Sequence, residues 1–226
     1  MPGPAEAGRE APPPGPALLF ERFPSRDFSR GEVLIDNTRH RTPPQDGSLA
    51  FIHEGLVRGA WNSPFIAPGS RAATLVAGDG KWIGADAFKY GPNLFRYDAL
   101  TDTSATVVPL ADFRAHAPRE TLLEALHSVS LDWCAAASVL SFGTDALIRR
   151  TMLLLYNLFR LHPRPEIEVR QQDVAELLGV SRQSIQPALK RLERAGLVSL
   201  GYGEIVVGEP DVLLEVLQRK RPFPRG

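Results

Sequence analysis

The apolar positions between residues 28 and 113 come in short runs that are broken by glycine and proline. Five of these runs have the length and the residue types of strands: residues 33–35, 49–61, 73–77, 81–85 and 105–110. Several short strands at close spacing are typical of a β-sandwich or a β-barrel. The pattern therefore predicts a β-rich domain in the first half of the chain.

After Pro118 the spacing of the apolar residues becomes helical, with successive steps of 4, 3, 4, 3 and 4 positions. These steps match the a and d positions of a heptad repeat, which pair one helix with another. The positions are Leu122, Leu126, Val129, Trp133, Ala136 and Leu140. Because small residues flank this narrow seam, we predict a helix that pairs with its copy in a second chain. An amphipathic helix packed on its own domain is the alternative, and Cys134, beside the seam, is interpreted as a packing residue.

A second helix is predicted over residues 145–161, with Thr144 or Asp145 as its N-cap. Apolar residues cover most of its circumference, so we expect it to be buried under the C-terminal region. Residues 167–170 are a further strand candidate. Residues 171–179 then predict a short helix that ends at Gly179.

The segment after Ser181 predicts an amphipathic helix, with Ser181 as its N-cap. Its apolar side consists of Ile185, Ala188, Leu189, Leu192 and Ala195. Its opposite side carries Gln183, Pro187, Lys190 and Arg194. A short helix, a tight turn and a second helix make a helix-turn-helix. Residues 197–207 hold two short β runs, which predict a hairpin wing.

The outward side of this helix has the side chains that read DNA in the major groove. Arginine pairs with guanine, and glutamine pairs with adenine. The base-reading candidates are Arg182, Gln183, Ser184 and Gln186. The candidates for phosphate contacts are Gln171, Gln172, Lys190, Arg191 and Arg194. A winged helix that makes only protein contacts is the alternative.

Pro187 is unusual because it lies at the sixth position of the predicted helix. A proline inside a helix removes a hydrogen bond and costs about 3 kcal/mol. A core helix has little reason to accept this cost, whereas an outward face relieves part of it by a bend. The ring is then placed to touch a thymine methyl group. Neutral drift is the alternative explanation.

The composition limits the possible partners, cofactors and cellular location of the protein. The chain has 226 residues and a formal net charge of zero, so DNA must be met by a local patch. The single cysteine argues against an iron–sulfur cluster and fits a reducing compartment. Residues 1–17 lack a signal-peptide pattern and are expected to be disordered. The longest apolar run, residues 152–159, is too short to span a bilayer, so we predict a cytoplasmic protein with no membrane partner.

Catalytic motifs are absent from the sequence: it contains no Walker loop, no HExxH and no nucleophile elbow. We therefore predict that the protein is not an enzyme. An enzyme or an adaptor with an appended winged helix is the rival class. The enzyme alternative requires a deep polar pocket with several titratable groups within residues 28–113.

The order of these elements resembles that of the bacterial Crp/Fnr superfamily of transcription regulators. The most specific part is DVAELLGVSRQSIQPALKRLERAGLVSLGYGEIVV, which is similar to the family's DNA-binding segment. FIHEGLVRGA resembles a strand pair of its cyclic-nucleotide-binding fold, with Gly55 at the turn, and GDGKWIGADAF resembles the run into its phosphate-binding cassette. The resemblance implies an α+β chain. Its parts are a tail (1–17), a β-roll or jelly-roll effector domain (18–117), a dimerisation helix (118–142) and a winged helix-turn-helix (143–226).

The resemblance also implies a homodimer that reads an inverted repeat in double-stranded DNA, with RNA polymerase as a candidate partner. The implied effector pocket comprises Gly84, Asp86, Arg96, Asp132 and Trp133. Cyclic-AMP binders of the family have a glutamate shortly after the cassette glycine and a Ser or Thr after the pocket arginine. Here Ala85-Asp86-Ala87 follows the glycine and Tyr97 follows the arginine, which argues against cyclic AMP. Haem, with His53 or His127 as axial ligand, and other small ligands remain open.

Overall fold

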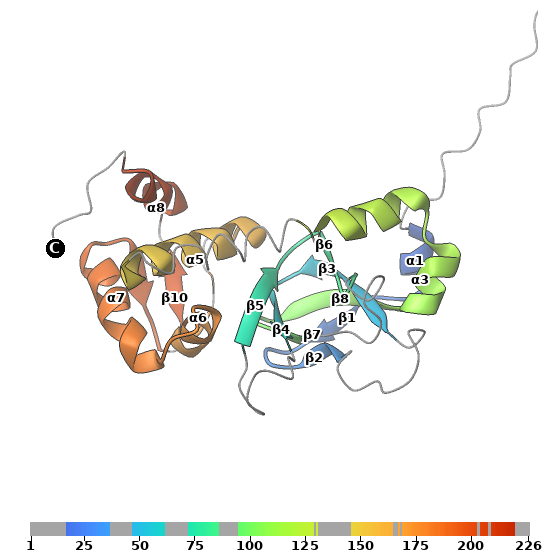
Figure 1. Cartoon of the computed structure of the whole chain (residues 1–226), viewed down its shortest axis with the longest axis horizontal. Helices are drawn as coiled ribbons and strands as arrows, with labels where there is room; N and C mark the ends of the chain where they lie inside the picture. Colours follow the sequence, from blue (N-terminus) through green and yellow to red (C-terminus); the bar gives the residue numbers. More distant parts are fainter. Residues whose placement is uncertain are drawn as a thin grey trace, which may run out of the picture.

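The computed structural model describes residues 17–36, 47–61, 72–85, 95–128, 130, 146–164, 167, 169–202, 204–207 and 209–219. The described residues form a β-rich N-terminal domain and a mainly helical C-terminal domain, which lie side by side (Figure 1). The predicted disordered tail falls almost entirely on residues 1–16, which lie outside the described residues. The α+β class and the order of β-domain before helix-turn-helix are as predicted.

The N-terminal domain is built from two four-stranded antiparallel sheets. The first has the order β1 (Arg26–Phe28), β8 (Thr103–Pro109), β3 (Ser48–Glu54) and β6 (Lys81–Ile83). The second has the order β2 (Val33–Asp36), β7 (Phe95–Ala99), β4 (Val57–Trp61) and β5 (Ala72–Ala77). Alternate residues of both sheets, among them Ile35, Ile52, Val57 and Tyr97, form a buried core cluster.

All five predicted apolar runs contain a strand, with boundaries that differ from those expected. The run 49–61 is two strands, because Gly55 has φ +107 and a Cβ there would lie 2.6 Å from the carbonyl oxygen of Asp102. The run 105–110 ends at Pro109, since Leu110 already begins α3 (Leu110–His116). Strands β1 and β7 were not predicted, because neither short segment has a distinct apolar run.

One end of the first sheet is covered by α1 (Ala17–Arg22), α3 and a helix over residues 119–128 (Figure 1). Trp82 lies at the centre of this contact, with its ring 4.9 Å from that of Phe113 in an edge-on arrangement. The helix 119–128 turns the buried Thr121, Ala125 and Ser128 toward the protein.

The predicted dimer seam lies on this helix and continues beyond it. Leu122 is half-buried against the aromatic cluster, whereas Leu126 is 41% exposed. Leu123 beside it is 55% exposed. The rest of the seam, Val129, Trp133, Ala136 and Leu140, lies outside the described residues, as does Cys134.

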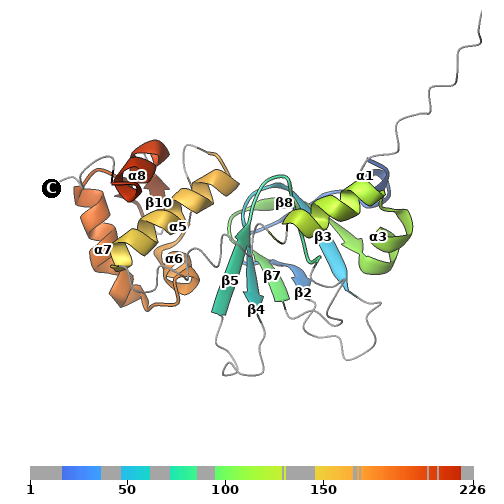
Figure 2. The ribbon, with the colours of Figure 1, turned by 45° about the horizontal axis from the view of Figure 1, so that its top comes forward.

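The C-terminal domain contains four helices and a two-stranded sheet among the described residues. Its elements are α5 (Leu147–Leu161), α6 (Gln171–Leu177), α7 (Arg182–Arg194), β9 (Val198–Leu200), β10 (Ile205–Val207) and α8 (Pro210–Leu217). Helix α5 packs against α7 and α8, as Figure 2 also shows. The predicted buried helix, helix-turn-helix and wing are therefore present, whereas α8 was not predicted.

Two local predictions in this domain are wrong. Helix α5 has Ala146 as its N-cap, with no side-chain hydrogen bond, instead of Thr144 or Asp145. The described residues of the segment 167–170 are not in a strand. Ile167 and Val169 are buried in the domain core, so their alternation reflects a buried connecting segment that has no partner strand.

The two domains are in direct contact. Leu56 and Leu100 of the β-domain belong to the same buried cluster as the core of the C-terminal domain. The backbone N–H of Asp79 donates to the carbonyl oxygen of Leu161 at 3.0 Å. In both ribbon views β5 is the strand that lies closest to α6 (Figures 1 and 2).

The core of the C-terminal domain predicts a clear stability difference between the two sides of α7. Leu189 is fully buried, so Leu189→Ala should lower the free energy of unfolding by about 2–5 kcal/mol. The matched control Gln183→Ala changes an exposed residue of the same helix and should stay within about 0.5 kcal/mol of the wild type. Urea denaturation measures both. Equal losses would contradict the observed burial.

Candidate nucleic-acid interface

The turn between α6 and α7 is fixed by local hydrogen bonds. Gly179 follows α6 with φ +65, a conformation that favours glycine. Ser181 is the N-cap of α7, as predicted, and its Oγ accepts a hydrogen bond from the backbone N–H of Ser184 at 3.1 Å. The hydroxyl groups of Ser181 and Ser184 are 2.8 Å apart. These contacts set the point at which α7 leaves the turn.

The apolar side of α7 decides which residues face outward. Ile185, Leu189 and Leu192 are fully buried and Ala188 is nearly so, as the sequence predicts. The side chains on the opposite side therefore have to point away from the domain. The predicted base-reading and phosphate-contacting residues of α7 are all exposed: Arg182, Gln183, Ser184, Gln186, Lys190, Arg191 and Arg194.

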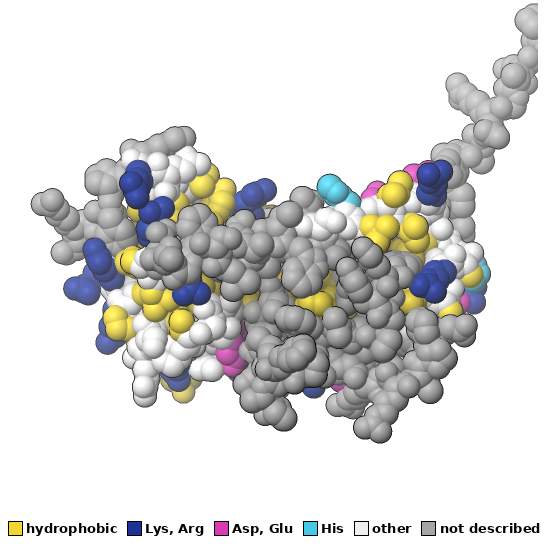
Figure 3. Space-filling model, viewed as in Figure 1, with side chains coloured by type: hydrophobic (Ala, Val, Ile, Leu, Met, Phe, Trp, Pro, Cys, Tyr) yellow, Lys and Arg dark blue, Asp and Glu magenta, His cyan; other side chains and the backbone are white. Residues whose placement is uncertain are grey.

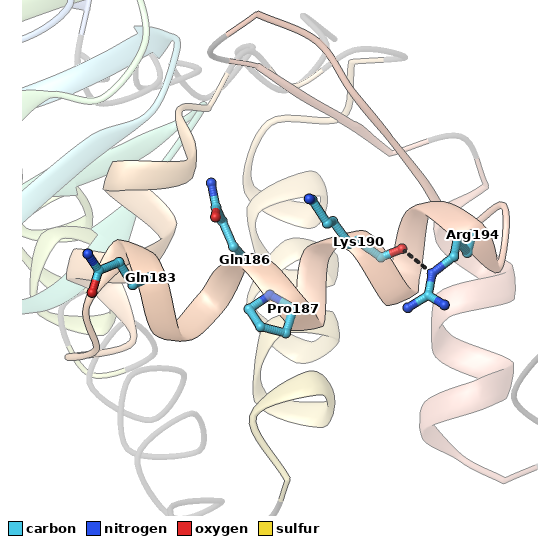
Figure 4. A pocket seen from close by; sticks show the side chains of 5 residues that line it. All are labelled: Gln183, Gln186, Pro187, Lys190 and Arg194. Carbon is cyan, nitrogen blue, oxygen red and sulfur yellow. Dashed lines mark hydrogen bonds between the residues drawn. The ribbon is translucent and has the colours of Figure 1, made fainter.

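Five side chains on the outer side of α7 line a shallow hollow (Figure 4). They are Gln183, Gln186, Pro187, Lys190 and Arg194. Gln186 and Lys190 extend in the same direction, and the Nε of Arg194 donates to the carbonyl oxygen of Lys190 at 3.3 Å. The lining thus combines two amides, two cations and one flat apolar ring, with no carboxylate among its residues.

The other predicted contacts lie at the edge of this hollow or beyond it. Arg182 is exposed in the first turn of α7 but does not line the hollow. Ser184 has its hydroxyl group engaged with the N-cap, which leaves it less suited to base contacts. At the start of α6, Gln171 is half-buried, and Gln172 is exposed and donates from Nε2 to Oε1 of Glu176 at 3.1 Å. Lys and Arg side chains also lie around the end of the molecule that carries α7 and α8 (Figure 3).

A buried ionic cluster, which no prediction from the sequence included, connects the β-domain to the helix-turn-helix. Arg58 of β4 is 5% exposed and Asp98 of β7 is 3% exposed. The Arg58 guanidinium donates from Nε (3.1 Å) and Nη2 (2.5 Å) to Oδ2 of Asp98. Its Nη1 donates to Oε2 of Glu176 on α6 at 2.6 Å and lies 3.6 Å from Oδ1 of Asp173. No sequence signal marks this cluster, because the pairing requires the register of β4 with β7.

The environment shifts the pKa values of two members of this cluster. Burial lowers the pKa of the Arg58 guanidinium, but Asp98, Glu176 and Asp173 outweigh it, so the pKa is raised overall. Burial raises the pKa of the Asp173 carboxyl group, an effect that Arg58 opposes only in part. The cluster therefore holds the Arg58 charge firmly, whereas the charge on Asp173 is less favoured.

The family model of the Crp-like helix-turn-helix domain matches residues 149–216, which run from the first turn of α5 to the last turn of α8. None of the curated proteins matches the sequence. The residues that match the family model include every predicted DNA-contacting side chain.

Solved structures extend the likeness to the whole Crp-like architecture. A CRP/FNR-family transcriptional regulator from Thermus thermophilus, TTHA1359, is 20% identical, with a TM-score of 0.64 and coverage of 86% of this chain and 98% of its own. A second regulator of the CRP family from that organism, TTHB099, is 19% identical, with a TM-score of 0.65 and coverage of 85% and 95%. The c-di-GMP-responsive regulator CLP from Xanthomonas campestris is 17% identical, with a TM-score of 0.61 and coverage of 85% and 97%.

The chain therefore matches the Crp-like helix-turn-helix model over residues 149–216, and its fold is similar to that of solved CRP/FNR-family regulators. The resemblance that the sequence motifs indicate is confirmed on both counts. At these identities the structural likeness is one of fold. The DNA contacts and the effector have to be argued from the residues themselves.

Only some of the predicted effector-pocket residues lie in the part of the chain that the structure describes. Gly84 follows β6 with φ +83, and a Cβ there would lie 2.6 Å from the carbonyl oxygen of Ser48, so backbone packing accounts for this glycine. Arg96 lies in β7, opposite Asp36 and Ala60. Asp86, Asp132 and Trp133 lie outside the described residues.

The two histidines considered as haem ligands are both described. The Nε2 of His53 lies 2.8 Å from the Oγ1 of Thr106, and burial lowers the pKa of His53. His127 is exposed on the helix 119–128. Within the part of the chain that the structure describes, no cluster of three or more His, Cys, Asp or Glu residues is arranged to hold a metal ion. None of the described helices has the length and apolar character to cross a membrane.

Pro187 gives a test of how this interface is built. The structure places it inside α7 and on the outward side, as predicted. Replacing it with alanine restores a backbone N–H to the helix, so Pro187→Ala should raise the free energy of unfolding by about 1–3 kcal/mol. Gln186→Ala, at the exposed neighbouring position, is the control and should change it by less than about 0.5 kcal/mol. If urea denaturation shows no increase in the free energy of unfolding for Pro187→Ala, the helix already compensates for the missing N–H and the steric clash of the proline.

Proposed function

We propose that the protein is a homodimeric transcription regulator that reads an inverted repeat in double-stranded DNA. One observation carries this proposal: α7 presents an exposed face rich in hydrogen-bond donors within a Crp-like helix-turn-helix domain. In such domains the second helix enters the major groove. A protein-binding winged helix would not need two cations and two amides on the same face.

We assign roles to these side chains from their positions along α7. Gln183 and Gln186 lie toward the N-terminal end of α7, where their amides pair with adenine N6 and N7. The ring of Pro187 lies beside them and suits contact with a thymine methyl group. Lys190 and Arg194 lie further along the helix and neutralise phosphates. Arg182, at the start of the helix, pairs with guanine at the edge of the contact.

Dimerisation would use the helix that begins after Pro118. Its outward side exposes Leu123 and Leu126, whereas its other side is already packed on the β-domain. Covering these leucines with a second copy of the helix removes apolar surface from water. The twofold axis of such a dimer would place one α7 on each half-site of an inverted repeat.

The β-domain is assigned the role of sensor. Its residues depart from the pattern that binds cyclic AMP, because Tyr97 follows Arg96 and Ala85 follows Gly84. The proposal therefore includes a small-molecule or haem effector other than cyclic AMP, RNA polymerase as a candidate partner, a cytoplasmic location and no enzymatic activity. Absorption spectra and native mass spectrometry of freshly purified protein identify any bound effector.

The proposed DNA contacts predict that two substitutions on α7 weaken DNA binding in different ways. Arg182→Ala should cost about 1–3 kcal/mol on the cognate site and relax the preference at one base position. Lys190→Ala should weaken all sequences about equally and reduce the salt slope by about one. Gel-shift titrations at several salt concentrations measure both effects, after selection of the preferred site from a random library.

The control for this experiment is Arg160→Ala. It removes an exposed cation that belongs to α5 and is not one of the proposed DNA contacts on α7. Its affinity and salt slope should match those of the wild type. If Arg182→Ala changes neither affinity nor base preference, Arg182 does not read a base. Failure of the wild-type protein to select any sequence would reject the regulator assignment.

The dimer model predicts that a charge in the predicted seam separates the protomers. Leu126→Glu and Trp133→Glu should each yield monomers in sedimentation velocity experiments, because a buried unpaired carboxylate is unfavourable at an interface. Glu124→Gln alters an exposed position of the same helix and should leave the dimer intact. A dimer that persists in both seam variants would place the interface elsewhere.

A further inference from the structure

The face of the second sheet that meets the C-terminal domain carries a short row of side chains. Arg58 of β4 lies directly opposite Asp98 of β7 on one side and Val76 of β5 on the other. Residues directly opposite one another in antiparallel strands share a face of the sheet. Their neighbours Val57, Leu75 and Ala99 belong to the core of the β-domain, so this row faces away from that core. It is the part of the sheet against which α6 packs.

Arg58 connects the two domains through a single guanidinium group. The Nε and Nη2 donate to Asp98 within its own sheet, and Nη1 donates to Glu176 on α6. Around this group, Leu56 and Leu100 pack into the core of the C-terminal domain and exclude water. An arginine fork bound on both sides fixes direction as well as distance, which a lysine would not do.

The contact between the domains requires the positive charge of Arg58, because several carboxylates lie around it. Three carboxylates surround one guanidinium: Asp98, Asp173 and Glu176. Arg30 adds a second positive charge that acts on Asp173. Removing the guanidinium would leave carboxylates in a partly buried space without their main partner, which strongly disfavours the docked arrangement. The position of α6 on the sheet therefore depends on Arg58.

Two further polar side-chain contacts join the domains at the segment after α5. The Nδ1 of His162 lies 2.9 Å from both carboxylate oxygens of Asp79, and Arg164 pairs with Glu54. Both involve the chain between α5 and α6 instead of the helix-turn-helix itself. Among the described interdomain ion pairs, the pairs made by Arg58 are those that reach α6.

We infer that Arg58 is a positioning residue, which holds α6 and with it the DNA-reading helix α7 at a fixed orientation relative to the β-domain. This inference rests on the proposed function as a dimeric DNA-binding protein. Helix α6 packs against α7, so a rotation of α6 on the sheet moves α7 with it. In a dimer held together through the helix 119–128, this orientation sets the distance between the two reading helices. Arg58 thereby determines which spacing of half-sites is preferred.

Glu176 connects this cluster to the start of the helix-turn-helix. Its Oε2 accepts from Arg58, and its Oε1 accepts from the amide of Gln172. Asp173 in the same turn accepts from the backbone N–H of Arg170 at 3.3 Å. The first turn of α6, where phosphate contacts are proposed, is thus tied to the β-domain through the same carboxylates that bind Arg58.

The test uses the full-length protein and a series of operators whose two half-sites are moved apart or together by one or two base pairs. The wild type should prefer one spacing. Arg58→Met should lose affinity for that spacing by at least about fivefold and bind all spacings nearly equally. Its base preferences within a half-site should be unchanged, which a general loss of folding would not leave intact. Arg58→Lys keeps the charge without the fork and should lie between the two.

Two variants keep the test interpretable. Glu176→Gln removes the α6 carboxylate that accepts a hydrogen bond from Nη1 of Arg58. It leaves Arg58 paired with Asp98 and close to Asp173, so it serves if Arg58→Met does not fold. It should flatten the spacing preference in the same direction. Arg26→Met breaks the exposed pair with Glu32 on the β-domain and is the matched control, with an unchanged preference. Spacing preferences that stay as sharp as in the wild type in both Arg58→Met and Glu176→Gln would overturn the inference.

Hydrogen exchange of the free protein separates this inference from the proposed function. Glu176→Gln should speed the exchange of amides in α6 and around Leu56 and Leu100, whereas Glu215→Gln on the exposed side of α8 should not. If the wild type binds no operator, the proposed function fails. The hydrogen-exchange result then tests the inference by itself. Faster exchange in Glu176→Gln supports Arg58 as the residue that holds the domains together, and unchanged exchange rejects that role.

Discussion

Burial of one side of α7 against α5 is the constraint on which the proposed interface depends. Ile185, Leu189 and Leu192 are fully buried in the core of the C-terminal domain, and that burial leaves the helix a single way to face. The amides and cations on the opposite side are then held outward on a rigid element. A face presented in this way needs no rearrangement of the domain before it meets a duplex, which lowers the entropic cost of binding.

The second constraint is electrostatic and lies between the domains. A guanidinium that is nearly fully buried gives little net stability, because desolvation offsets much of its attraction to carboxylates. Instead, the guanidinium fixes the relative orientation of the domains, because its N–H groups are hydrogen-bonded only when Asp98 and Glu176 are both in place. The apolar contacts of Leu56 and Leu100 provide adhesion, whereas the ionic cluster provides orientation. The β-domain and the helix-turn-helix are thus joined by a contact that has one preferred arrangement.

Pro187 shows how the energetic cost of a proline depends on its position in a helix. Inside a buried helix, the missing N–H and the steric clash would both disturb the core. On the outward side of α7, the ring lies among polar side chains and the helix stays continuous over residues 182–194. The position tolerates proline because no packing partner is displaced there. The same position makes the ring part of the surface that the proposal assigns to DNA.

The sequence by itself determined the secondary structure of the helix-turn-helix, the side of α7 that is buried, the N-cap Ser181 and most of the strands. These features are local: they follow from apolar spacing, capping chemistry and turn residues within a few positions. Strands β1 and β7 carry no such local pattern. Residues 167–170 have a strand-like pattern, but none of the described residues among them is in a strand. Only the tertiary structure decided which residues join the domains. Arg58 and Asp98 are 40 positions apart, and Arg58 and Glu176 are 118 apart, so their pairing depends on strand register and domain docking, which no local pattern encodes.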